Sequence, residues 1–220
     1  MNNIKNYRER ELVMYIIACL LVYICFDGKL FEFGTADKIV IISNLLGSTL
    51  MMGAISIFAF ISDSLFSNRI KDIILSIFGL IKKPGYTIFE RIEKNNKDDR
   101  YSKTEALHKY SDIYANIHVS KKSTGLYQNR EWNKIYSKYR DVSMISVSNR
   151  DYLLCRDIFF STIIIGVIYA IAVLIKVLDF NFKYILFLVI ALIITFFATH
   201  LKARRFVGNV IAYDILREDE

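Results

Sequence analysis

The sequence predicts an all-α membrane protein, with four transmembrane helices arranged as two hairpins around a helical cytoplasmic insert. Of its 220 residues 54% are hydrophobic, and these residues gather in blocks without charge. A bilayer core of about 30 Å needs about 20 apolar helical residues. The blocks are Leu12–Phe26, Ile39–Ile61, Ile158–Ile175 and Tyr184–Ala198, the last continuing to Leu201. We therefore expect a first hairpin at 12–65, an insert at 66–156, a second hairpin at 157–201 and a tail at 202–220.

The first block is short, and a cleaved signal peptide is the alternative reading. Arg8 and Arg10 would form its charged region and Leu12–Phe26 its apolar region. The residues that follow, Phe26-Asp27-Gly28-Lys29, offer no site of the small-x-small type. We therefore expect the block to stay as a membrane anchor.

The distribution of Lys and Arg predicts the orientation of the chain. With four spans, the N-terminus, the insert and the tail lie on one side, and that side carries 25 of the 29 basic residues. Basic residues favour the cytoplasmic side. We expect a multi-pass protein of the cell membrane with both termini in the cytoplasm. Topology and anionic lipid also account for the net charge of +7 without a nucleic-acid partner.

The second block is the least lipid-like of the four. Small and hydroxylated residues favour close helix packing, and the same face is also suited to line a water-filled path. A path would require a ring of subunits, which predicts a homo-oligomer. The candidate pore-lining residues are Asn44, Ser48, Thr49, Gly53, Ser56, Phe60 and Asp63. No charge lies mid-span in any block, which argues against an ion-coupled transporter.

The insert is patterned as helices throughout. Isoleucines at helical spacing predict an amphipathic helix over Ile70–Ile81, with Lys71 away from its apolar stripe. The stretch Glu93–Arg100 is typical of a solvated turn. Ser102 and Glu105 form a capping-box pattern that opens the next helix, which should end at Lys121–Gly125. A last helix is expected from near Leu126 through Tyr152 towards the third span.

A basic, aromatic segment of the insert is the candidate ligand site. Arg130, Lys134 and Lys138 recur at every fourth position and form a stripe along one helix. Basic and aromatic side chains together are suited to bind phosphates and stacked bases. They are equally typical of a lipid headgroup interface. Residue types alone slightly favour the lipid interface. The candidate ligand-binding residues are Lys121, Lys122, Tyr127, Arg130, Trp132, Lys134, Tyr136, Lys138 and Arg140.

Catalytic and metal-binding patterns are missing from the sequence. The three histidines are isolated, and neither a zinc motif nor a phosphate-binding glycine loop occurs. The three cysteines lie in or beside spans without paired spacing, which is typical of packing residues. We expect a protein that is not an enzyme and that carries no cofactor and no metal.

Two helical hairpins around a basic helical insert resemble the membrane effector of Hailong-type antiphage systems. The resemblance covers the whole chain as architecture and transfers no individual residue. In that family a channel-like membrane protein is held shut by an oligodeoxyadenylate that a partner nucleotidyltransferase makes. The resemblance implies a nucleotide or single-stranded oligonucleotide signal at Lys121–Arg140 and a gate in the second span.

These observations together predict an oligomeric membrane effector or channel that is gated by an anionic signal, in antiphage defence. The alternative is a non-conducting membrane anchor or scaffold. Its basic insert would bind a cytoplasmic partner or lipid headgroups.

Overall fold

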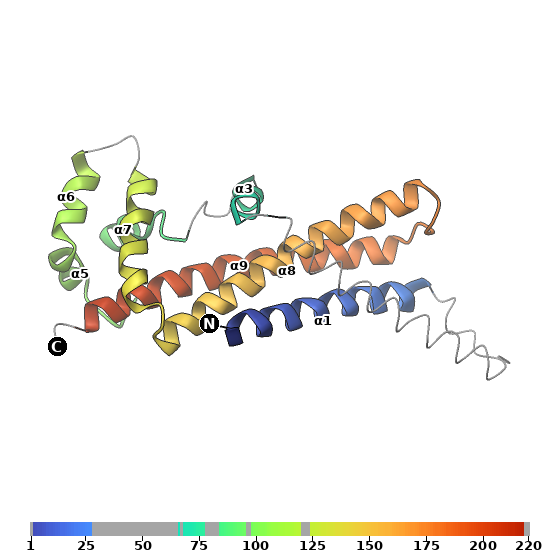
Figure 1. Cartoon of the computed structure of the whole chain (residues 1–220). Helices are drawn as coiled ribbons and strands as arrows, with labels where there is room; N and C mark the ends of the chain where they lie inside the picture. The colour runs from blue at the N-terminus through green and yellow to red at the C-terminus, as the bar shows by residue number, and fades with distance from the viewer. Residues whose placement is uncertain are drawn as a thin grey trace. The chain divides into compact units, whose positions relative to one another are not determined.

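The computed structural model describes residues 2–27, 66, 68–77, 84–95, 98–119 and 124–217 (Figure 1). Every regular element in these ranges is a helix, so the predicted all-α class is confirmed for this part of the chain. The helices are α1 (Asn2–Asp27), α3 (Asn68–Ile77), α4 (Ile88–Lys94), α5 (Lys103–Lys109), α6 (Ser111–Val119), α7 (Thr124–Tyr139), α8 (Ser143–Leu174) and α9 (Phe182–Leu216).

The chain divides into two compact units. The first consists of Met1–Lys71 and Leu153–Ala198, and the second of Asp72–Tyr152 and Thr199–Glu220. Helices α8 and α9 are continuous and contribute residues to both units. The insert and the C-terminal segment, which the sequence analysis treated separately, thus share the second unit.

Helices α1, α8 and α9 form the core of the first unit. Leu12 and Ile16 of α1 are buried against Ile158 of α8. Further along, Tyr23 of α1 packs edge-on against Tyr169 of α8, with ring centroids 5.8 Å apart. Apolar helices without a charged face associate through such side-chain packing, and α1 therefore lies along α8.

Two described helices, α8 and α9, are long and apolar enough to cross a membrane. They contain the predicted third and fourth spans. Helix α1 covers the predicted first span, but its apolar stretch is too short to cross a membrane by the same test. This stretch, Leu12–Phe26, is only about 22 Å long at about 1.5 Å per residue. The predicted second span lies outside the described residues. The described part of the chain therefore supports two of the four predicted spans.

Helix α8 is capped at its C-terminus by a residue with a left-handed backbone conformation. Lys176 has φ 59°, the conformation that helix ends usually give to glycine. Its backbone N–H donates to the carbonyl of Val173, and the N–H of Val177 donates to that of Ala172. This is the Schellman pattern, which satisfies carbonyls that the helix end leaves without partners.

A buried carboxylate is shared by three cations in the first unit. Asp157 of α8 lies 3.1 Å from Arg8 of α1, 3.1 Å from Lys71 of α3 and 3.4 Å from Arg156. Lys71 was expected on the polar side of its helix, away from the apolar stripe. Instead it is buried, while Ile70 and Ile73 are exposed. The charge of Asp157 explains this orientation, because a buried charge needs a partner.

Helices α4 to α7 form the second unit with the first turns of α8 and the last turns of α9. Phe206 of α9 lies at its aromatic centre and contacts Trp132 and Tyr136 of α7. Tyr152 of α8 stacks on the same ring. Aromatic rings bury large apolar areas and prefer such edge-on and offset contacts.

The structure corrects three of the expected helix boundaries. The capping box at Ser102 and Glu105 is present, but the helix that it opens is interrupted at Tyr110. The single helix expected from Leu126 through Tyr152 is instead α7 and α8, separated at residues 140–142. The fourth span was expected to end at Leu201, but α9 continues as a helix to Leu216.

Tertiary contacts within the second unit explain these differences. Tyr110 is buried, and its hydroxyl donates to Asp214 of α9 over 2.6 Å. Helices α7 and α8 both pack on Phe206, so the chain must turn between them. The last turns of α9 bury Val210 and Ile211 completely, and that burial stabilises the helix to its end.

Candidate functional site

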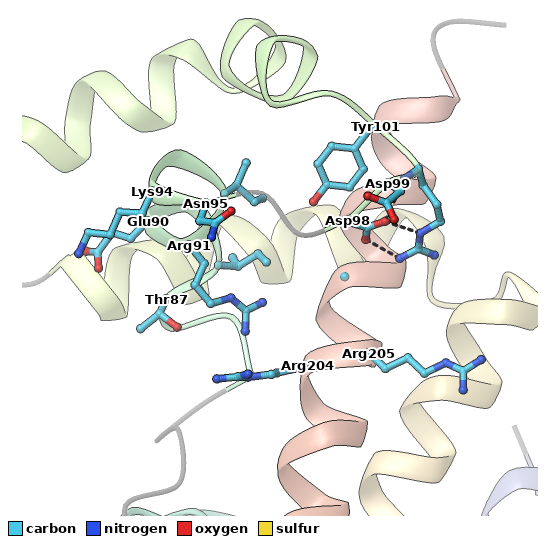
Figure 2. Close-up of a pocket in the computed structure, with 14 residues that line it drawn as sticks. Thr87, Glu90, Arg91, Lys94, Asn95, Asp98, Asp99, Tyr101, Arg204 and Arg205 are labelled. Atoms are coloured by element: carbon cyan, nitrogen blue, oxygen red, sulfur yellow. Dashed lines mark hydrogen bonds and ion pairs between the residues drawn. The ribbon is translucent and has the colours of Figure 1, made fainter.

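A large cleft lies within the second unit, bordered by α4, Asn95, residues 98–101 and α9 (Figure 2). Its volume is about 920 Å³, which is in the range of small-molecule sites. We call it the α4–α9 cleft. Its lining residues are Thr87, Ile88, Glu90, Arg91, Ile92, Lys94, Asn95, Asp98, Asp99, Arg100, Tyr101, Arg204, Arg205 and Gly208.

The amphipathic pattern of α4 decides which of its side chains face the cleft opening. Ile88, Phe89 and Ile92 are buried, and the ring of Phe89 packs edge-on against Tyr110. With this face turned to the core, the charged residues of α4 point away from it. Arg91 is therefore directed to the cleft by the packing on the opposite side of the helix.

The start of α4 is held by a side chain from another helix. No side chain at its N-terminus caps it. The carboxamide oxygen of Gln128 on α7 accepts from the backbone N–H groups of Phe89 and Glu90, at 3.1 and 3.3 Å. Its amide nitrogen donates to the Glu90 carboxylate over 2.9 Å. Gln128 is fully buried, so it satisfies N–H groups that the helix itself cannot.

Arg100 anchors residues 98–101 to α9 through a hydrogen bond to Asn209 and also pairs with Asp98. Arg100 donates to Asp98 at 2.7 and 2.8 Å and to the Asn209 carboxamide oxygen at 2.8 Å. The hydrogen bonds from Arg100 hold the pKa of the Asp98 carboxyl below its ordinary value. The positive charge of Arg100 is therefore already paired with Asp98 in the wall of the cleft.

Two other arginines converge on the cleft from opposite walls. Figure 2 shows Arg91 reaching from α4 towards Arg204 of α9, whereas Arg205 and Lys94 point elsewhere. Burial lowers the pKa of the Arg91 guanidinium from its ordinary value, and the positive charge of Arg204 lowers it further. A guanidinium nevertheless stays charged in proteins. Two like charges are therefore held near each other.

Neither member of the Arg91–Arg204 pair has a carboxylate within ion-pair distance among the described residues. Nearby, burial raises the pKa of Tyr101 to about 12, and the negative charge of Asp98 adds to the effect. Its hydroxyl is thus protonated at neutral pH. Arg91 is half-buried and Arg204 is exposed. Two guanidinium groups beside a protonated hydroxyl are suited to bind a phosphate or another oxyanion.

Catalytic sites commonly use metal ions and residue types such as histidine and cysteine. In the part of the chain that the structure describes, no group of three His, Cys, Asp or Glu side chains is arranged to hold a metal ion. The cleft lining contains no histidine and no cysteine.

The predicted basic stripe lies on the exposed face of α7. Arg130 and Lys134 are both paired with Glu131, at 3.4 and 2.7 Å. Arg130 also lies over the ring of Tyr127, 5.5 Å from its centroid. Lys138 is exposed.

The remaining residues of the predicted ligand site are not gathered at one place. Trp132 is buried in the core and stacked with Tyr136, and Arg140 is 3.5 Å from Asp141. Lys121 and Lys122 lie outside the described residues. A ligand role for this segment stays a prediction.

The predicted pore-lining residues all lie in a segment that the structure does not describe. They are Asn44, Ser48, Thr49, Gly53, Ser56, Phe60 and Asp63. Their proposed role likewise stays a prediction.

The sequence analysis missed the Arg91–Arg204 pair, although a weak signal was present. Ile88, Phe89 and Ile92 are spaced as one face of a short helix, which leaves Arg91 on the other. Arg204 follows the fourth apolar block by three residues. Nothing in the sequence indicates that these two positions meet.

No protein-family model, curated protein or solved structure matches the chain.

Proposed function

We propose that this protein is a homo-oligomeric membrane effector or channel whose helical cytoplasmic unit receives an anionic signal. The observation that carries the proposal is the Arg91–Arg204 pair, which lines the α4–α9 cleft without a carboxylate partner among the described residues. The signal is a phosphate-bearing ligand, and a nucleotide or oligonucleotide from a partner nucleotidyltransferase is the class that the sequence analysis favours. Four spans with both termini in the cytoplasm remain part of the proposal.

The exposure of α8 and α9 supports the membrane part of the proposal. Only 33% and 17% of the residues in their most apolar stretches are buried, whereas the core helix of a soluble protein is largely covered. Ile171 of α8 and Ile194 and Phe197 of α9 are more than half exposed. Exposed apolar side chains on two long apolar helices are suited to a lipid environment.

The electrostatics of the cleft supports the proposal that it binds an anion. Holding Arg91 and Arg204 together costs free energy in the unliganded protein, because like charges repel and burial removes water from one of them. An anion between them would replace repulsion with two charge-assisted interactions. Guanidinium groups bind phosphate in the bidentate geometry that makes such contacts strong.

The position of Arg204 suggests how binding affects the membrane helices. It follows Leu201, the end of the predicted fourth span, by three residues in the same continuous helix α9. A ligand that draws Arg204 and Arg91 together therefore acts directly on a proposed membrane-spanning helix. The ligand shifts the membrane part only by its difference in affinity for the two states.

A binding experiment tests the cleft. Titration of the detergent-solubilised protein with ATP and with a short single-stranded oligodeoxynucleotide is expected to show binding that Arg91→Gln and Arg204→Gln each weaken by about tenfold or more. Lys103→Gln removes an exposed charge elsewhere in the second unit and serves as the control. Unchanged affinity in both arginine variants would contradict the proposal.

A rival site on α7 is tested in the same series. Arg130→Gln and Lys138→Gln remove charges from the predicted basic stripe without touching the α4–α9 cleft. If these variants lose binding while Arg91→Gln retains it, the stripe is the receptor. If anionic vesicles alone compete for the stripe, it serves as a lipid interface and the anchor or scaffold alternative gains support.

A further inference from the structure

The start of helix α3 is held against α8 by three contacts, all of them within the first unit. The ring of Phe66, which precedes the helix, packs edge-on against Phe160, with ring centroids 4.8 Å apart. The Lys71 ammonium lies 3.1 Å from the Asp157 carboxylate and 5.9 Å from the centroid of the same Phe160 ring. These contacts fix the start of α3 next to residues 157–160 of α8.

This part of α8 is the place where its sequence changes from charged to apolar. Asp157 is followed by the charge-free block of residues 158–175, which is the proposed third span. Arg8 of α1, which also pairs with Asp157, likewise precedes the apolar block that begins at Leu12. In the proposed topology, this level of both helices is therefore the boundary between the cytoplasm and the lipid.

Two isoleucines of α3 are exposed, although a lysine of the same helix is buried. Lys71 and Leu75, one turn apart, are buried. Ile70 and Ile73, three residues apart, lie together on another side of the helix, where 39% and 58% of their surfaces are exposed. In a water-soluble protein isoleucine is among the residues most often buried, and lysine is almost never fully buried. The isoleucine side of α3 is therefore suited to apolar surroundings.

We propose that α3 is an interfacial helix, which lies on the cytoplasmic surface of the membrane with Ile70 and Ile73 in contact with lipid. This inference rests on the membrane part of the proposed function. Interfacial helices bury their apolar side about 5–10 Å into the boundary between headgroups and acyl chains. The contacts with Asp157 and Phe160 hold α3 at this boundary. Its partner is the lipid bilayer, to which the exposed apolar side chains of α8 and α9 are also suited.

The position of α3 in the chain gives this lipid contact a role. In sequence, α3 follows the candidate pore-lining residues and precedes α4, which borders the α4–α9 cleft. A helix that is fixed on the lipid surface at this point holds the beginning of the cytoplasmic insert at the membrane.

Quenching of tryptophan fluorescence by brominated lipids tests this inference on the whole protein in nanodiscs. Trp132, the one tryptophan of the chain, is buried, so the signal of the wild type serves as the background. We expect Ile73→Trp to be quenched more by lipids brominated near the headgroup than by lipids brominated near the chain end. Ile194→Trp, in the middle of the proposed fourth span, should show the opposite preference.

Val119→Trp is the control for the affinity of tryptophan itself for lipid. Val119 ends α6 in the second unit and is 87% exposed. Its replacement should show the emission of a tryptophan in water and no quenching by either lipid. Quenching of Val119→Trp as strong as that of Ile73→Trp would overturn the inference, because any exposed tryptophan would then enter the bilayer.

The outcomes also separate this inference from the function on which it rests. If Ile194→Trp is quenched and Ile73→Trp is not, the inference is wrong while the membrane part of the proposed function stands. If neither is quenched, both fail. Blue-shifted emission of Ile73→Trp without quenching would assign this side of α3 to a second copy of the chain and would refute lipid contact. Should Ile73→Trp not fold, Ile70→Trp places the probe on the same side of α3 with the same expectations.

Discussion

At the scale of single residues, the molecule contains two contrasting clusters of charge. In the first unit three cations share the buried carboxylate of Asp157. In the second unit Arg91 and Arg204 face each other without a described carboxylate partner. Removing one member of a compensated buried cluster destabilises a fold. For the uncompensated pair, we propose that a bound anion relieves the repulsion between the two guanidinium groups.

Removing one charge of the Arg91–Arg204 pair should weaken anion binding without lowering the stability of the protein. In Arg91→Gln the repulsion and the burial of a charge are both relieved, so we expect a free energy of unfolding equal to or above that of the wild type. An anion at one hundred times its Kd should stabilise the wild type by about 2.7 kcal/mol and the variant by far less. Melting temperatures with and without phosphate ester measure both effects. A variant that is destabilised yet equally responsive to the anion would show that Arg91 is structural.

Removing the carboxylate of Asp157, by contrast, should destabilise the protein. We expect Asp157→Asn to lower the free energy of unfolding by about 3–5 kcal/mol, because buried cations lose their counterion. Asp151 forms ion pairs with Arg150 and Lys202 but is more exposed, so Asp151→Asn should cost at most about 1 kcal/mol. Denaturation in detergent compares the two variants, and similar losses would contradict this account of Asp157.

At the scale of elements, the sequence predicts a helix best where local chemistry decides it. The capping box at Ser102 and the apolar run of α8 were both predicted. The turn between α7 and α8 was not, because it arises from packing on Phe206. The end of α9 carried a readable signal, since Phe206, Val207, Val210 and Ile211 recur at helical spacing.

The turn between α8 and α9 offers a stabilising substitution. Lys176 has a left-handed backbone, which costs a residue with a Cβ roughly 1–2 kcal/mol. Lys176→Gly should therefore raise the free energy of unfolding by about 1 kcal/mol. Lys183→Gly is the matched control, because it removes the same charge within helix α9 and should destabilise. Equal effects of the two changes on the melting temperature would refute the explanation.

The capping of α4 by Gln128 links an element to the candidate site. Gln128→Ala leaves two buried N–H groups without an acceptor, at a cost of about 1–3 kcal/mol. Since α4 carries Arg91, anion affinity should fall together with stability. Hydrogen exchange at Phe89 and Glu90 monitors the cap, and unchanged exchange would show that Gln128 does not hold the helix.

At the scale of the whole molecule, the fold class was predictable and the candidate site was not. Charge-free apolar blocks are properties of short segments, so α8 and α9 could be read from the sequence. The α4–α9 cleft depends on the meeting of Arg91 and Arg204, which lie far apart in the chain and are brought together by the packing of Phe89 and the anchoring of Arg100 on Asn209.

The central claim is that an anion in the α4–α9 cleft controls the membrane part of the protein. Dye or ion flux through liposomes that contain the purified protein tests it most directly, measured with and without nucleotide. We predict that nucleotide changes the flux of the wild type and of Lys103→Gln, and has no effect on the Arg91→Gln, Arg204→Gln double variant. A flux that responds equally in all three, or no flux in any of them, would contradict the account.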